Sequence, residues 1–192
     1  EFPEYKGERF ILRSNLKEML QTIKNSSLIP HPSSLIVVLA SGDPGLYGIA
    51  DYLIKNLGRD AVEIIPNVSA MQWAFAKAKV SWNDARIVSS HGRGMDKVLE
   101  AAREAEKIGI FTSNGDEPSE IAKLLIDNGL TDFTAYICED LGMETEKLSE
   151  MPVTEIVGKS FAALNVIVIV RQGSGLRSKG LEGGISLTPC SL

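Results

Sequence analysis

Cysteine is scarce in this chain. Cys138 and Cys190 are its only two cysteines among 192 residues, and neither lies in a Cys-x-x-Cys or a Cys/His spacing. This usage argues against a disulfide framework and against a zinc site. It fits a reducing compartment, so we expect a cytoplasmic protein with no metal.

A long apolar run is also lacking. The longest one, residues 161–170, is interrupted by Asn165 and is too short to span a bilayer. The first residues show no basic region followed by an apolar one, which a secretory signal would require. We therefore expect neither a membrane segment nor a signal peptide, and no membrane partner.

Basic residues are outnumbered by acidic ones. The chain has 20 Lys and Arg against 25 Asp and Glu, a formal net charge of −5, and no basic cluster. This balance disfavours nucleic acid as the main ligand. The remaining composition, 44% hydrophobic and 23% charged, is ordinary for a globular protein, and the length allows one large domain or two small ones.

Short β-branched runs alternate with helical patterns along the chain. Strands are predicted at residues 9–12, 35–40, 62–65, 86–89, 108–112, 134–138 and 163–170, and helices are predicted to begin near residues 16, 46, 69, 95 and 118. The helix predictions rest on apolar spacing such as that of Ile121, Leu124 and Leu125. This alternation predicts an α/β fold.

A polar connection at residues 80–84 predicts the boundary between two domains. We expect an N-terminal α/β domain over residues 1–84 and a C-terminal α/β domain over residues 85–172. Residues 173–192 lose all periodicity and are rich in Gly and Ser, which is typical of a flexible tail or of a remnant added for expression.

The bend Ser-Gly-Asp-Pro-Gly at residues 41–45 follows the apolar run 35–40. In open α/β sheets ligands bind beyond the carboxyl ends of strands, and glycine lets the backbone approach them closely. Asp43 can cap the following helix or accept hydrogen bonds from an amine or a hydroxyl. The same residues also fit an ordinary strand-to-helix turn. No Walker lysine or Gly-x-Gly-x-x-Gly spacing is present, so no phosphate site is predicted.

A second bend, Ile-Pro-Asn-Val-Ser-Ala, occupies residues 65–70. Asn67 belongs to the few residue types that tolerate a positive φ, and Ser69 is a favourable N-cap. This bend also fits a purely structural turn. Two such bends in succession predict the two sides of one crevice.

Two further loops follow predicted strands. In Ser-Ser-His-Gly-Arg-Gly, residues 89–94, His91 can donate a hydrogen bond or move a proton, and Arg93 can pair with a carboxylate. An exposed loop without a ligand fits this segment equally well. In residues 111–118, Asp116 and Glu117 are most simply favourable charges at a helix N-terminus.

Four segments in this order carry a family resemblance: residues 40–44, 65–70, 82–86 (Trp-Asn-Asp-Ala-Arg) and 90–93. Together they resemble the tetrapyrrole methylases. More narrowly, they resemble the C5-methylating branch of cobalamin (vitamin B12) biosynthesis, the precorrin-6Y or (cobalt-)precorrin-7 C5-methyltransferases. The Gly-Asp-Pro turn marks the superfamily, and the His-Gly-Arg loop points to the branch.

The resemblance implies the two-domain tetrapyrrole methylase fold, with S-adenosylmethionine (SAM) in the cleft between the domains. The cofactor-binding residues that it implies are Ser41, Gly42, Asp43, Leu46, Ser69, Ala70, Thr112 and Leu164. Tyr47, His91 and Arg93 would face a corrinoid precursor, whose many carboxylates suit an arginine. A homodimer is implied, as is a C15-methyltransferase and decarboxylase domain as a candidate partner.

Members of this family open with a first strand and a Gly-x-Gly-Pro-Gly loop. Neither is found at the start of this sequence, which begins at Glu1. We therefore expect the first strand of the N-terminal sheet to be missing.

Methyl transfer from SAM requires chiefly that a nucleophilic ring carbon be aligned with the methyl group. His91 is a candidate weak base, and no other catalytic residue is assigned.

One alternative is a methylase of the same fold with another acceptor, as in diphthine synthesis or ribose methylation of ribosomal RNA. Another is a noncatalytic nucleotide-binding or assembly module. The acidic balance and the His-Gly-Arg loop disfavour the RNA acceptor.

Overall fold

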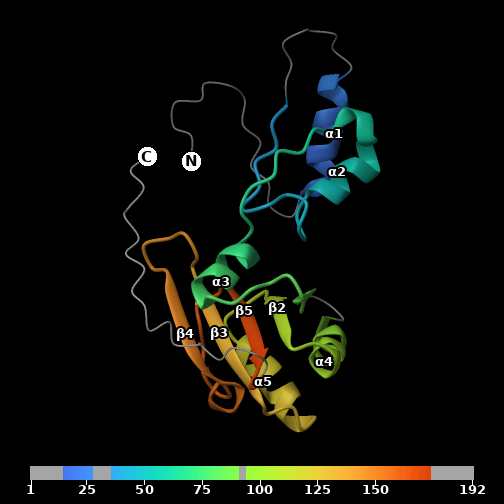
Figure 1. Cartoon of the computed structure of the whole chain (residues 1–192). Coiled ribbons are helices and arrows are strands. Elements are labelled where there is room, and N and C mark those ends of the chain that lie inside the picture. Colours follow the sequence, from blue (N-terminus) through green and yellow to red (C-terminus); the bar gives the residue numbers. More distant parts are fainter. Residues whose placement is uncertain (1–14, 28–35, 91–93, 174–192) are drawn as a thin grey trace, which may run out of the picture. The chain divides into compact units, whose positions relative to one another are not determined.

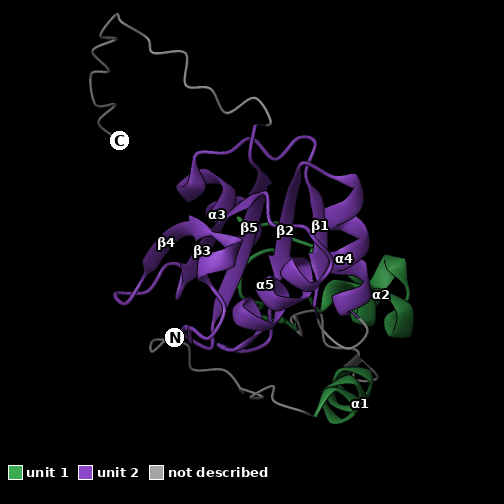
Figure 2. Ribbon diagram, turned by 90° about the horizontal axis from the view of Figure 1, so that it is seen from below, with its two compact units in different colours: residues 1–69 green, residues 70–192 purple. Residues whose placement is uncertain are grey.

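The computed structural model describes residues 15–27, 36–90 and 94–173. The chain divides into two compact units, residues 1–69 and residues 70–192 (Figures 1 and 2). Along the chain the elements are α1 (Leu16–Ser27), α2 (Ala50–Leu57), η1 (Arg59–Ala61), α3 (Ala70–Ala78), β1 (Arg86–Ser89), α4 (Gly94–Glu104), β2 (Lys107–Phe111), α5 (Glu117–Asp127), β3 (Phe133–Glu139), β4 (Lys147–Pro152), η2 (Val153–Glu155) and β5 (Asn165–Arg171).

The second unit is built on one five-stranded sheet with the strand order β1-β2-β5-β3-β4 (Figure 2). β1 and β2 are parallel and are connected through α4, as a parallel pair requires a crossover. All other neighbours pair antiparallel. The predicted α/β class is therefore confirmed, and the sheet is a mixed one.

Helices cover both faces of this sheet. Ile108 and Ile110 of β2 are fully buried in the core formed with α4, α5 and η2. Gly109, between them, faces the opposite side, where α3 packs: a Cβ at this position would lie 2.3 Å from Met71 Sδ and 2.9 Å from Phe75 Cε2. The alternation of side chains along a strand thus gives each face its own helical layer.

At one edge of the sheet, three strands end and the other two begin. The pairings Ser89↔Phe111, Phe111↔Val166 and Glu139↔Asn165 place the carboxyl ends of β1, β2 and β3 beside the start of β5. β4 starts there as well, because Lys147 pairs with Glu139. We call this the carboxyl edge of the sheet.

The first unit packs α1 against α2. Its buried core consists of Met19, Ile23 and Leu53, and Val38 and Val62 are among the half-buried side chains that pack against it. This core is small for a unit of this size. Among the described residues, the first unit therefore has a much smaller buried core than the second.

Two predicted strands of the first unit are wrong for the residues that the structure describes. Residues 36–40 and 62–65 form no strand, and Val37, Leu39 and Ile65 are exposed. A β-branched run becomes a strand only when a neighbouring segment completes its hydrogen-bond ladder. No described residue of the first unit does so. The predicted strand at residues 9–12 lies outside the described residues, and the missing first strand stays a prediction.

The remaining predictions agree more closely with the structure. α1, α3, α4 and α5 and strands β1, β2, β3 and β5 begin within two residues of their predicted starts. α2 begins at Ala50, four residues later than predicted, because the chain first passes through a tight bend. β4 was not predicted.

The compact units divide between Ser69 and Ala70 because α3 packs against β5, β2 and β3 of the second unit. The domain boundary predicted between residues 84 and 85 stays a prediction, and the predicted tail lies outside the described residues except for Gly173. In the part of the chain that the structure describes, no helix has both the length and the apolar character needed to cross a membrane.

Candidate functional site

The Gly-Asp-Pro bend of the first unit is held by its own polar groups. Gly42 has a positive φ of 67°, and the backbone N–H of Gly45 donates to Asp43 Oδ1 at 2.7 Å. The N-cap of α2 is Ile49, which makes no side-chain capping bond. The prediction that Asp43 caps this helix is therefore wrong: its carboxylate closes the bend instead. Within the described residues Asp43 Oδ2 has no partner, so it can accept a hydrogen bond from a ligand.

Tyr47 lies in the same bend with a left-handed backbone, at φ 54°, and its side chain is 61% exposed. The next residue must be glycine, because a Cβ at Gly48 would lie 2.4 Å from the carbonyl oxygen of Pro44. This close approach is the reason that α2 starts late. The structure thus brings five predicted site residues together in one bend: Ser41, Gly42, Asp43, Leu46 and Tyr47.

The second bend has a different local geometry from the one expected. Asn67 does not adopt a positive φ; its Oδ1 accepts the N–H of Val68 at 2.8 Å. Ser69 is buried at 3% exposure, and Ala70 is the first residue of α3. These two predicted cofactor residues fall on either side of the division between the compact units. The predicted crevice between the two bends stays a prediction.

At the carboxyl edge of the second unit, Thr112 is bound to the start of β5. Its hydroxyl oxygen lies 2.7 Å from Asn165 Oδ1 and 2.5 Å from the Asn165 carbonyl oxygen, to one of which it donates. The preceding residue, Leu164, is 56% exposed. The structure therefore places Thr112 and Leu164, two predicted cofactor residues that are far apart in the sequence, at the same edge.

A buried carboxylate lies at this edge, where β1 and β2 end. Glu117, the first residue of α5, accepts three hydrogen bonds: from Ser90 Oγ at 2.7 Å, from the Ser113 N–H at 2.6 Å and from Ser113 Oγ at 2.5 Å. From the sequence alone, Glu117 is predicted only as a favourable charge at a helix N-terminus. Its distance of four and eight residues from Ile121 and Leu125 was the available signal that it shares their buried face.

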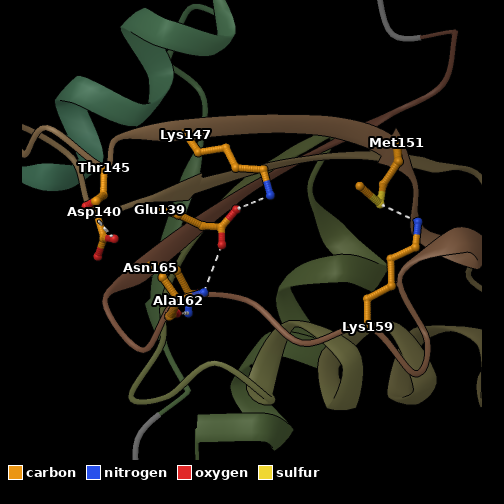
Figure 3. A network of polar contacts seen from close by, with 8 residues as sticks. All are labelled: Glu139, Asp140, Thr145, Lys147, Met151, Lys159, Ala162 and Asn165. Atoms are coloured by element: carbon orange, nitrogen blue, oxygen red, sulfur yellow. Dashed lines mark hydrogen bonds and ion pairs between the residues drawn. The ribbon is translucent and has the colours of Figure 1, made fainter.

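A second buried carboxylate, Glu139, ends β3 (Figure 3). Its Oε1 accepts the N–H of Ala162 at 2.8 Å. Its Oε2 is also buried and accepts no hydrogen bond from the described residues, although Lys147 Nζ lies 3.4 Å away. Sequence analysis missed this residue because the predicted strand ended one position earlier, and a glutamate at a strand end gives no sign of burial.

His91 and Arg93, the predicted proton acceptor and carboxylate partner, lie outside the described residues.

The fold and the site together define an α/β protein with polar groups gathered where its strands end, which is where such proteins bind small ligands. Residues 8–157 match the family of tetrapyrrole (corrin/porphyrin) methylases. The chain belongs to this family.

Individual relatives agree with the family. The chain is 35% identical to the cobalt-precorrin-7 C(5)-methyltransferase of Salmonella typhimurium over 170 residues. The aligned residues make up 88% of this chain and 80% of the Salmonella enzyme. It is 34% identical to the probable cobalt-precorrin-7 C(5)-methyltransferase of Methanocaldococcus jannaschii, over 84% of this chain and 76% of that one. Among solved structures, uroporphyrin-III C-methyl transferase from Thermus thermophilus, complexed with S-adenosyl homocysteine, shares the fold with a TM-score of 0.64 at 17% identity, over 86% and 77% of the two chains.

Proposed function

We propose that this chain is a SAM-dependent C-methyltransferase that methylates C5 of cobalt-precorrin-7 in cobalamin biosynthesis. The observation that carries this proposal is the 35% identity to the Salmonella enzyme of that activity, over 88% of this chain and 80% of that one. A second relative with the same described activity, from Methanocaldococcus jannaschii, supports it. Its localisation in a reducing cytoplasm follows from the cysteine usage and stays a prediction.

SAM supplies a methyl group already activated on a sulfonium, so the residues of this chain need to bind and align rather than to activate. We assign this task to Ser41, Gly42, Asp43, Leu46, Ser69, Ala70, Thr112 and Leu164. The unpartnered carboxylate oxygen of Asp43 suits an amine or a hydroxyl of the cofactor. The hydroxyl of Thr112 and the exposed Leu164 at the carboxyl edge offer a polar and an apolar contact beside each other.

Tyr47, His91 and Arg93 are assigned to the corrinoid. The exposed Tyr47 ring offers a flat apolar surface, and an arginine binds the carboxylates of the macrocycle. His91 is the candidate base that accepts the proton which the ring carbon loses. In single-turnover reactions we expect His91→Ala to slow methyl transfer, whereas an unchanged rate would remove His91 as the base.

The direct test is turnover of the purified chain with SAM and cobalt-precorrin-7. We expect the corrinoid to gain the mass of one CH2 unit, because a methyl group replaces the proton that the ring carbon loses, with S-adenosylhomocysteine formed in equal amount. Parallel reactions with metal-free precorrin, with ribosomal RNA and with the protein acceptor of diphthine synthesis test the other acceptors. Methylation of one of these instead of a corrinoid would contradict the proposal. Failure to bind SAM at all would favour a noncatalytic assembly module.

A homodimer, and a C15-methyltransferase and decarboxylase as partner, complete the proposal. Light scattering during size-exclusion chromatography measures the molar mass and so tests whether the chain forms a homodimer. We expect this chain alone to add one methyl group only, at C5.

A further inference from the structure

Glu139 connects two segments of the carboxyl edge that are distant in the sequence. It ends β3, and its buried Oε1 accepts the backbone N–H of Ala162 at 2.8 Å (Figure 3). A hydrogen bond from a backbone amide to a carboxylate is among the stronger ones in proteins. The turn of residues 162–165, which we call the β5 entry turn, is therefore held from outside by this carboxylate.

The β5 entry turn is fixed from its other side by Asn165. Its side-chain amide donates to the carbonyl oxygens of Ala162, at 2.8 Å, and of Asn114, at 3.0 Å. One of its own two oxygens accepts the hydrogen bond that the Thr112 hydroxyl donates. The N–H of Asp140, next to Glu139, also donates to the Leu164 carbonyl oxygen at 2.9 Å. One continuous network of hydrogen bonds thus runs from Glu139 through the turn to Thr112.

The contact with Lys147 has a different character. The ion pair at 3.4 Å is long, and the Lys147 side chain is 64% exposed, so solvent screens it. The part-buried hydrogen bond from the Ala162 N–H is consequently the interaction through which Glu139 acts. Among the described residues, the second oxygen of Glu139, Oε2, is buried and accepts no hydrogen bond, and an unsatisfied buried polar atom costs stability.

We propose that Glu139 is a positioning residue for SAM: it sets the place of the β5 entry turn and so of Leu164 and Thr112. This inference rests on the proposed function, which assigns these two residues to the cofactor. Glu139 itself need not touch SAM. Its removal leaves the Ala162 N–H without its acceptor and frees the turn, so that Leu164 and Thr112 lose their arrangement and SAM binds more weakly.

Three variants test this proposal by calorimetric titration with SAM and by steady-state kinetics. We expect Glu139→Ala to weaken SAM binding about tenfold and to raise KM for SAM, with kcat at saturating SAM little changed. Glu139→Gln keeps an oxygen acceptor for the Ala162 N–H and is expected to restore most of the affinity. Lys147→Ala removes only the ion pair and is expected to bind SAM like the unmodified chain.

Asp132→Ala is the matched control for a general loss of stability. Asp132 pairs with Arg171 Nη1 at 2.7 Å at the other end of β3, away from the carboxyl edge. Thermal unfolding of all variants compares their stabilities. If Glu139→Ala folds poorly, Glu139→Asp keeps the charge, shortens its reach, and is expected to weaken SAM binding in the same direction.

Unchanged SAM affinity in folded Glu139→Ala overturns the inference and leaves the proposed function intact. Equal losses of affinity in Glu139→Ala and in an equally destabilised Asp132→Ala also overturn it. If the unmodified chain itself does not bind SAM, the proposed function fails and this inference fails with it.

Discussion

The Glu117 carboxylate accepts three hydrogen bonds within a buried site that joins the end of β1 to the start of α5. In Glu117→Ala the N–H and the hydroxyl of Ser113 lose this acceptor, whereas the Ser90 hydroxyl keeps the Phe111 carbonyl oxygen, 2.9 Å away, as an acceptor. We expect the free energy of unfolding to fall by about 3 kcal/mol, measured by urea denaturation.

Glu120 on the same helix is exposed and is the matched control. Glu120→Ala should leave the midpoint of unfolding nearly unchanged. Equal stabilities of the Glu117 and Glu120 variants would contradict the structural role of Glu117.

Cys138 is predicted to be unreactive in the folded protein. Burial raises the pKa of its thiol to about 11, so at pH 8 the reactive thiolate is scarce and the side chain is inaccessible. In a Cys190→Ala background, we expect no labelling by a thiol reagent at pH 8 in buffer and full labelling in guanidinium. Fast labelling of the folded chain would show that β3 is not buried as described.

At the residue scale, the sequence patterns select candidate ligand residues in bends and at strand ends, and these assignments stay predictions. The bend of residues 41–47 and the edge residues Thr112 and Leu164 were selected from patterns of Gly, polar residues and strand ends. Glu117 and Glu139 were overlooked as site residues because a carboxylate is normally solvated, and only the tertiary packing shows that these two are buried.

At the scale of elements, the predictions succeeded where a run had a partner. β1, β2, β3 and β5 are apolar strands that pair in one sheet, and their patterns were sufficient. Residues 36–40 and 62–65 have similar apolar patterns, but no described segment pairs with them as a neighbouring strand. The sequence pattern of a run does not show whether such a neighbour exists. β4, with the sequence Lys-Leu-Ser-Glu-Met-Pro, was missed for the opposite reason. It is an edge strand without β-branched or aromatic residues, and it forms because β3 completes its hydrogen-bond ladder.

The packing of α3 on the sheet leads to a prediction about Gly109. A Cβ there would lie 2.3 Å from Met71 Sδ and 2.9 Å from Ile87 Cδ1, so α3 must move or side chains must leave their rotamers. We expect Gly109→Ala to lower the free energy of unfolding by about 1–3 kcal/mol, measured by urea denaturation.

A double-mutant cycle with Met71→Ala separates this clash from a general effect on the strand. Shortening Met71 removes the nearest atom, so the added methyl group of Gly109→Ala should cost less in the Met71→Ala background. Additive effects of the two substitutions would show that the Met71 side chain does not cause the clash at Gly109.

At the scale of the whole molecule, the two compact units differ in their described cores. The buried cluster of the first contains three described residues, and that of the second is a contiguous core shared by α4, α5, η2 and the three strands β2, β3 and β5. We expect amide hydrogen exchange, followed by mass spectrometry, to be fast in residues 36–49 and 62–68 and slow in β2, β3 and β5.

Bound ligand stabilises the segments that hold it, so adding SAM should slow amide exchange in both units. We expect the slower exchange in peptides that contain residues 41–47, residues 69–70, Thr112 or Leu164. Protection confined to one unit would contradict the assignment of cofactor residues to both.

The central claim is that this chain transfers a methyl group from SAM to C5 of a corrinoid. It is tested by the reaction of cobalt-precorrin-7 with SAM labelled with carbon-13 in its methyl group, with the position of the label in the methylated corrinoid determined by NMR. The account predicts a single labelled methyl group on C5. A label at another carbon, or none on the corrinoid, would contradict it.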